Sequence, residues 1–153
     1  MVKRTTLTTI EVAFVAQQRN AHLATSDEAG NPSLVPVCYA YDGQYFYTPL
    51  DEKPKSIPAS QLRRVRNIQA RHSAVLLIDQ YRDDWTQLGY IQIQGQADII
   101  QPEHELHAHA LVLLRQRYSQ YHTMNLEQLP CILITPRHIH SWGPALQDAH
   151  DPA

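Results

Sequence analysis

The chain is poor in cysteine, glycine, phenylalanine, tryptophan and methionine. Only two cysteines and five glycines occur among 153 residues, with two residues each of phenylalanine, tryptophan and methionine. Cys38 and Cys131 both lie in apolar runs, so we expect buried, inert free thiols in a reducing compartment rather than a disulfide. The formal net charge of −2 excludes a global field that would attract nucleic acid or anionic lipid.

Long hydrophobic runs are missing as well. No apolar stretch approaches the length of about 20 residues that spans a bilayer, and no apolar segment follows Lys3 and Arg4 as in a signal peptide. The hydrophobic fraction of 43% and the charged fraction of 18% are typical of a globular chain. We therefore expect a soluble cytoplasmic protein with a single domain over residues 1–145, fraying after Gly143 into a tail over residues 146–153.

Hydrophobic periodicity predicts a mainly β protein with flanking helices. Thr8 and Glu11 form a capping-box pattern, which predicts a helix from there to about residue 19. Helical spacing recurs over residues 60–70, and Pro102 suits the start of a longer helix to about residue 121. Apolar runs predict six strands, over residues 22–26, 33–41, 45–49, 74–78, 88–100 and 131–142. Hairpin links between the early strands favour a closed antiparallel barrel, and Gly95 in mid-strand indicates a bulge or a close backbone approach.

A cluster of cations follows the strand at residues 45–49. Lys53 and Lys55 flank a proline, and Ser56 comes next. Like charges this close repel unless an anion lies between them, and a phosphate would accept hydrogen bonds from Lys, Arg, Ser and backbone N–H groups together. We predict a phosphate site here, completed from the following helix by Arg63, Arg66 and Asn67. The alternative is a solvated charged loop followed by the solvent face of a helix.

The order of these segments resembles the pyridoxamine 5′-phosphate oxidase-like split barrels, which bind flavins and deazaflavins. The resemblance is carried by residues 24–32, 35–39, 51–56, 62–68, 76–79, 83–85 and 88–97. The Lys-Pro-Lys cluster, the Leu-Arg-Arg-Val-Arg-Asn-Ile helix and the Asp-Asp-Trp turn are the most specific of these. Together they are similar to the subgroup of deazaflavin-dependent oxidoreductases.

The resemblance implies a six-stranded FMN-binding split barrel that forms a homodimer with two cofactor sites at the interface. It implies that Lys53, Lys55 and Ser56 hold the cofactor phosphate. The strand along the ring, which binds it through main-chain groups, corresponds to Pro36, Val37 and Cys38, and Trp85 corresponds to an aromatic residue at the rim of the ring. The implied cofactor is F420 or FMN. Gly89 and Gln92 stand where deazaflavin-dependent members carry an aromatic residue and an arginine, which keeps FMN a close competitor.

The function predicted on this basis is transfer of a hydride between the bound cofactor and a small organic acceptor. Because a flavin carries the chemistry itself, the sequence predicts no catalytic side chain. The alternative is a non-catalytic FMN, F420 or haem carrier. A weaker alternative is a metal-dependent enzyme using His104, His107 and His109, which by default are solvated helix residues. His138, His140 and Trp142 are expected to serve packing.

Overall fold

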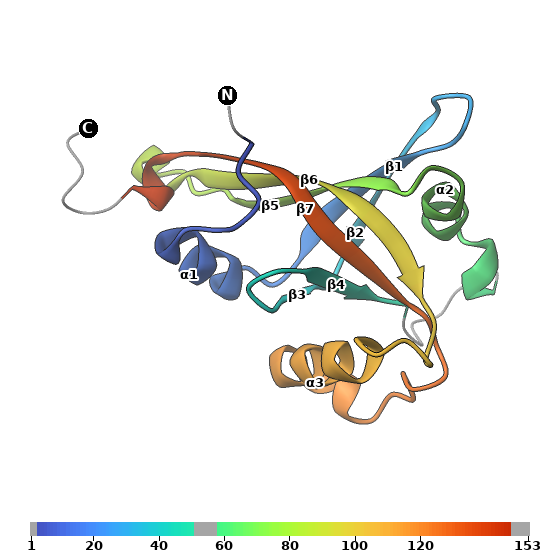
Figure 1. Ribbon diagram of the computed structural model, residues 1–153. Helices are drawn as coiled ribbons and strands as arrows, with labels where there is room; N and C mark the ends of the chain where they lie inside the picture. The colour runs from blue at the N-terminus through green and yellow to red at the C-terminus, as the bar shows by residue number, and fades with distance from the viewer. Residues whose placement is uncertain (1–2, 51–57, 148–153) are drawn as a thin grey trace.

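The computed structural model describes residues 3–50 and 58–147 and shows an antiparallel sheet curled into a half-barrel, with three α-helices around it (Figure 1). The predicted split-barrel fold is confirmed. The helices are α1 (Thr9–Gln17), α2 (Arg63–Arg71) and α3 (His107–Arg117). The strands are β1 (Ala21–Ser26), β2 (Pro32–Val37), β3 (Ala40–Tyr41), β4 (Phe46–Pro49), β5 (Ser73–Gln80), β6 (Gly89–Ile100) and β7 (Cys131–Trp142).

The described sheet has seven strands rather than the six predicted, in the order β2-β1-β5-β6-β7-β4-β3. The run expected as one strand over residues 33–41 is divided at Cys38 and Tyr39. The N–H of Tyr39 donates to the hydroxyl of Tyr118, 3.1 Å away, instead of to a neighbouring strand. β2 therefore continues the sheet at one edge and β3 at the other, and no ladder among the described residues joins these two edges.

The two long strands β6 and β7 form the spine of the half-barrel, and their register shifts between Gln94 and Gly95. A Cβ at Gly95 would lie 2.7 Å from the carbonyl oxygen of Thr135. The glycine is thus needed for the close approach of β7, and the bulge and close contact predicted there are both confirmed.

Two hydrophobic clusters explain the apolar patterns. The first fills the half-barrel, where Phe14 of α1 and Val65 and Ile68 of α2 pack against alternate residues of the strands. The second lies under α3, where its apolar face covers β3, β4 and the first half of β7. Because those strand segments are covered on both faces, the sequence there reads as a continuous apolar run rather than an alternating one.

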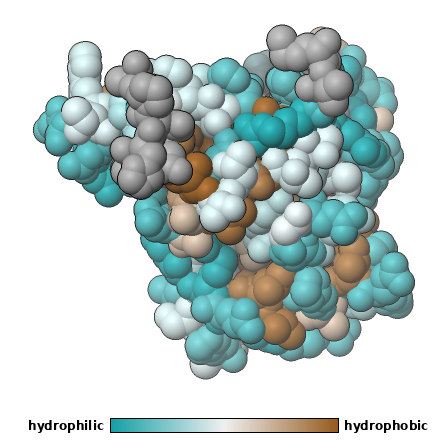
Figure 2. Space-filling view, turned by 60° about the vertical axis from the view of Figure 1, so that its left-hand side comes forward, coloured by the Kyte–Doolittle hydropathy of each residue, from teal (hydrophilic) through white to brown (hydrophobic). Residues whose placement is uncertain are grey.

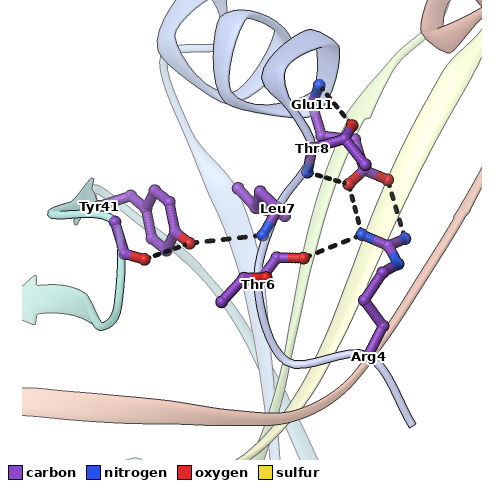
Figure 3. A network of polar contacts seen from close by, with 7 residues as sticks. Arg4, Thr6, Leu7, Thr8, Glu11 and Tyr41 are labelled. Carbon is purple, nitrogen blue, oxygen red and sulfur yellow. Dashed lines mark hydrogen bonds and ion pairs between the residues drawn. The ribbon is translucent and has the colours of Figure 1, made fainter. Parts of the chain in front are cut away.

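The predicted capping box at the start of α1 is present and is extended by an ion pair (Figure 3). The Thr8 hydroxyl accepts from the N–H of Glu11 at 3.3 Å, and the Glu11 carboxylate accepts from the N–H of Thr8 at 2.9 Å. Arg4 donates to both carboxylate oxygens of Glu11, at 2.5 and 3.0 Å. From β3, the Tyr41 hydroxyl lies 3.5 Å from the N–H of Leu7, so this network ties the N-terminal segment to the sheet.

Several local predictions are wrong. α3 begins at His107 rather than Pro102, because residues 101–106 form turns in which the N–H of His104 bonds to the carbonyl of Gln101. Fraying does not begin after Gly143, since η4 (Pro144–Leu146) returns to the sheet through a bond from Ala145 N–H to the Leu88 carbonyl. Among the described residues, no helix is both long and apolar enough to cross a membrane. Both cysteines are free, but Cys38 is only half-buried.

Candidate functional site

A cavity of about 600 Å³ lies between α2 and the tip of the β1–β2 hairpin, which are neighbours at one end of the sheet (Figure 1). We call it the α2 cavity. It brings together three of the predicted site residues, Arg63, Arg66 and Asn67. The remaining lining residues are Asp27, Glu28, Ala29, Gln69 and Ala70. Two guanidinium groups thus face a pocket of the size that a phosphate-bearing ligand needs.

The helix α2 presents these cations because its apolar residues face the sheet. Val65 and Ile68 are fully buried, which leaves Arg63 and Arg66 on the opposite, exposed side. Asn67 is 3% exposed, and its amide donates to the hydroxyl of Thr25 on β1, 3.0 Å away. Asn67 therefore fastens α2 to β1, a role that the sequence did not reveal.

The hairpin side of the α2 cavity is held by Asp27. Its carboxylate accepts hydrogen bonds from the N–H groups of Ala29 and Asn31 and from the Asn31 amide, at 2.9 to 3.0 Å. These bonds, first of all the one from the Asn31 side chain, lower the pKa of Asp27, and the nearby charge of Arg63 adds to the effect. Gly30, with φ of +87°, allows the turn. Because the carboxylate is engaged with its own turn, the 4.0 Å pair with Arg63 is a loose one.

The residues predicted from the Lys-Pro-Lys cluster, Lys53, Lys55 and Ser56, lie outside the described residues. They remain predictions.

The segment predicted to lie along a ring does not present one face. Pro36 points outward from the sheet, Val37 is buried in the half-barrel, and Cys38 lines a different cavity. Main-chain donors are also reduced here, because Pro36 has no N–H and the N–H of the neighbouring Tyr39 is already bonded to Tyr118. β2 is nevertheless an edge strand, so alternate N–H groups on the side away from β1 can reach a ligand.

The second cavity, of about 460 Å³, opens where β2 ends and is lined by aromatic and sulfur-containing side chains. We call it the Cys38 cavity; the described lining residues are Arg19, Cys38, Tyr118, Gln120, Tyr121 and Met124. The guanidinium of Arg19 lies 4.8 Å from the centre of the Tyr118 ring, which fixes a cation at the wall. None of these partners was predicted, since only the fold brings the end of α3 to residues 19 and 38.

Arg117 holds this wall in place. Its guanidinium lies over the rings of Tyr39 and Tyr118, at 4.7 and 5.2 Å, and donates to the carbonyls of Ala16 and Gln18. The Tyr118 hydroxyl in turn donates to the carbonyl of Arg19, 2.9 Å away. Burial raises the pKa of Tyr39, so this phenol stays protonated and donates to the Val15 carbonyl. The Cys38 cavity therefore has a rigid, aromatic wall.

The predicted rim residue Trp85 lies at the other end of the sheet from α2. It begins the short helix η2 (Trp85–Gln87) and is 68% exposed. β5, whose eight residues span about 26 Å, lies in the chain between the end of α2 and the loop that leads to Trp85. Within one chain, the structure does not bring Trp85 to Arg63 or Arg66.

A third cavity, of about 360 Å³, lies near that end, on the outward face of β5 and β6. Tyr81, Tyr90 and Trp142 line it together with Asp79 and Leu77. The rings of Tyr90 and Trp142 are 6.1 Å apart, and Trp142 is 54% exposed. Trp142 therefore does not fill the core of the single chain, and a dimer contact, the other packing role expected for it, stays a prediction.

The helix histidines of the metal hypothesis have separate partners. His104 Nδ1 accepts from the N–H of Leu106, the buried His107 donates to the Leu129 carbonyl at 2.7 Å, and His109 lies 3.5 Å from Asp42. Across the described part of the chain, no group of three or more His, Cys, Asp or Glu side chains is arranged to hold a metal ion. His107 and His109 therefore tie α3 to its surroundings, whereas His104 bonds within the turn before α3. The buried His107 is not the solvated residue expected by default.

Comparison with known proteins agrees with this architecture. A family model described as pyridoxamine 5′-phosphate oxidase matches residues 8–143. No curated protein matches the chain.

Similar solved structures include the haem storage protein HutZ from Vibrio cholerae, with 11% identity and a TM-score of 0.67, covering 87% of this chain and 91% of HutZ. A conserved hypothetical protein from Mycobacterium tuberculosis has 22% identity and a TM-score of 0.67, with 100% and 97% coverage. A structure named F420 reductase has 17% identity and a TM-score of 0.57, with 84% and 94% coverage. At these identities the structures share the fold. Because the family model spans most of the chain, the protein belongs to the pyridoxamine 5′-phosphate oxidase family.

Proposed function

We propose that the protein binds FMN or F420 and transfers a hydride between this cofactor and a small organic acceptor in the cytoplasm. The observation that carries the proposal is the α2 cavity, in which Arg63 and Arg66 converge beside a buried, fastened Asn67. In the sequence, Lys53, Lys55 and Ser56 precede this helix by a few residues. Membership of the family and the likeness to a structure named F420 reductase support a flavin-type cofactor.

The donor set fits a phosphate. Guanidinium groups donate in a planar fork that matches phosphate oxygens, and they stay charged at any physiological pH. Arg63 and Arg66 are exposed at the cavity, and the described ion pair of Arg63 with Asp27 is a loose one at 4.0 Å, since the Asp27 carboxylate is engaged with its own turn. A bound flavin or deazaflavin would supply the hydride chemistry, and the chain would supply binding and orientation.

We further propose a homodimer built on the outward face of β1, β2 and β5. The register places Leu34 beside Ala24 and Ala24 beside Val75, so apolar side chains form a row across three strands. Leu34 is 67% exposed in the single chain, which is unusual for a leucine next to further apolar residues. In the view of Figure 2, apolar side chains reach the surface at separate places among hydrophilic ones. A second copy covering this face would bury the row.

A non-catalytic carrier is the second candidate. A structural neighbour is named as a haem storage protein, and the described residues that line the Cys38 cavity include no carboxylate or imidazole that could act as acid or base. A carrier would bind its cofactor without turnover.

Titration of the purified protein with FMN, with F420 and with haem, followed by fluorescence quenching and absorbance, tests binding. We expect saturable binding of one of the first two. Reoxidation of the reduced cofactor by quinones and enones, compared with the free-cofactor background, then separates an enzyme from a carrier. Saturable binding of haem alone would refute the proposal and favour the carrier.

The phosphate site is tested by Lys55→Ala, with Arg82→Ala as the control because Arg82 is an exposed cation on the β5–β6 loop. We expect Lys55→Ala to weaken cofactor binding by about 1.5–3 kcal/mol, the range of a charge-assisted hydrogen bond. Arg82→Ala should leave the dissociation constant unchanged. Equal dissociation constants for wild type and Lys55→Ala would place the phosphate elsewhere.

A further inference from the structure

A separate cavity of about 400 Å³ lies on the outward face of β6 and β7, at the bulge between these strands. We call it the bulge cavity. The cofactor proposal does not use it, and it shares no lining residue with the α2 cavity among the described residues. Its described lining residues are Lys3, His72, Ser73, Gln94, Gly95, Gln96, Arg137 and His138.

The bulge places two consecutive side chains of β7 at this cavity. In a regular strand, neighbouring residues point to opposite faces. Here Gln94 pairs with His138 and Gly95 pairs with Pro136, so Arg137 is the extra residue. Both Arg137 and His138 consequently line the cavity. Bulges frequently re-aim a side chain in this way beside a functional site.

Gly95 and Pro136 are residue types that suit the backbone of the bulge. Gly95 cannot carry a Cβ, which would meet the Thr135 carbonyl oxygen at 2.7 Å, and Pro136 has no N–H to donate to the ladder. The geometry that exposes Arg137 and His138 is thereby fixed by the backbone.

Arg137 is held in position by a chain of polar contacts. Its guanidinium donates to the amide oxygen of Gln96 at 2.8 Å, and the Gln96 amide nitrogen lies 3.2 Å from Asp98. Asp98 also accepts from His72 Nδ1 at 3.0 Å. His72 itself is held in the left-handed region, with φ of +53°, where it ends α2. The Asp98 carboxylate is thus engaged with His72 and Gln96. The Arg137 guanidinium donates to Gln96, and most of its N–H groups remain for a ligand.

The lining is cationic. Lys3 and Arg137 carry fixed positive charges, and two imidazoles lie beside them. No acidic residue is among the described residues that line the cavity. His138 Nδ1 is buried and has no hydrogen-bond partner among the described residues, so the other ring nitrogen, Nε2, is the one that can act toward the cavity. Amide groups of Gln94 and Gln96 add neutral donors.

We propose that the bulge cavity binds the phosphate group of a small phosphorylated ligand. A phosphate accepts hydrogen bonds from several directions at once, and this cavity offers an arginine fork, a lysine, imidazole and amide donors converging on one hollow. A single carboxylate would use fewer of these donors. The site adds an anion-recognition function at a cavity that shares no described lining residue with the cofactor phosphate site proposed at α2.

The test is an NMR titration of the cofactor-free full chain with sodium phosphate at constant ionic strength. We expect saturable shifts of the backbone amides of Gln94, Gln96 and His138. Arg137→Gln should raise the phosphate dissociation constant about tenfold or more, because it removes a charge-assisted donor. Lys3→Gln should weaken binding as well, and neither exposed substitution perturbs the core.

Arg82→Gln is the matched control, since it removes the same charge at an exposed site outside the cavity. Unchanged binding in this variant, with a loss in Arg137→Gln, supports the proposal. Shifts that rise linearly without saturation, or equal losses in the two arginine variants, would overturn it.

Sodium acetate serves as the second probe. Acetate binding as tight as phosphate binding would show a carboxylate site and would also overturn the phosphate assignment. Because the shifts are read at Gln94, Gln96 and His138, which do not line the α2 cavity, they distinguish this site from phosphate binding at α2.

Discussion

The buried carboxylate of Glu11 offers a sharp test of how the N-terminal segment is fixed. Its side chain is 4% exposed, and it accepts two bonds from Arg4 and one from the N–H of Thr8. Glu11→Gln keeps the size of the side chain but removes the charge and turns one acceptor into a donor. The amide nitrogen would then face Arg4 or the Thr8 N–H, both of which are donors.

The expected loss is about 2 kcal/mol in the free energy of unfolding. Losing one partner of a buried, hydrogen-bonded ion pair costs about 3–5 kcal/mol. The smaller figure applies here because Arg4 is 37% exposed, so water screens the pair and can solvate the arginine left behind. For a chain of this size, a loss of about 2 kcal/mol lowers the melting temperature by about 4–8 °C.

The loss depends on pH in a defined direction. Burial alone would raise the pKa of Glu11, but hydrogen bonds from Arg4, Ser141 and Thr8, together with the charge of Arg4, outweigh it and lower the pKa below its ordinary value of 4.5. A carboxyl whose pKa is lower in the folded state stabilises the fold fully above the unfolded value. That stability is lost as the pH falls through the folded value.

Urea denaturation of wild type and Glu11→Gln should therefore show a difference that is constant near neutral pH and shrinks below about pH 4.5. Glu103→Gln, at an exposed position, is the control and should change little at either pH. The same difference at neutral and at acidic pH would refute the role assigned to the charge.

Two other substitutions test the bulge and the dimer. Gly95→Ala should destabilise the protein by about 1–3 kcal/mol, because its Cβ would lie 2.7 Å from the backbone oxygen of Thr135. Gly89→Ala should cost less in urea denaturation, because its Cβ would meet only side-chain atoms, at 3.2 Å and beyond. Leu34→Asp should shift the protein from dimer to monomer in analytical ultracentrifugation, whereas Val112→Asp, on an exposed apolar residue of α3, should not. A wild type that sediments as a monomer would contradict the proposed dimer.

Signals confined to one turn or one strand predicted the structure well. The capping box needs only Thr8 and Glu11, and both reciprocal bonds are present. Gly95 alone indicated the bulge, because a glycine in mid-strand weakens the strand unless the backbone bends there or another backbone comes close. Pro102, by contrast, led to a wrong prediction of where α3 begins. A proline suits the first turn of a helix, but it also suits the turns that residues 101–106 form before α3 begins.

The candidate site was predicted only in the part that lies on one helix. Arg63, Arg66 and Asn67 share α2, so their proximity follows from helical geometry, and the structure brings them to one cavity. The walls contributed by other segments were missed. The Asp27 turn reaches the α2 cavity because α2 packs against β1, a contact between distant segments that no local pattern specifies.

Cys38 lies away from the α2 cavity because the chain leaves the sheet after β2 and rejoins it at the other edge as β3. A strand can leave its sheet only if its backbone groups find other partners, because an unpaired buried N–H costs about 1–3 kcal/mol. Tyr118, at the end of α3, supplies such a partner for Tyr39 and is itself held by Arg117 and by the Arg19 carbonyl. The chain can therefore turn from β2 at one sheet edge to β3 at the other.

This turn leaves Cys38 half-buried at the opening between the two edges, where the Cys38 cavity lies. An aromatic hydroxyl 79 residues away in the sequence thus replaces a strand pairing, and the same residue forms a wall of the cavity. Because one side chain both permits the split and lines the opening, the edge backbone of β2 stays accessible without a further strand to cover it. This is the backbone that the family resemblance of the sequence predicts to lie along the cofactor ring.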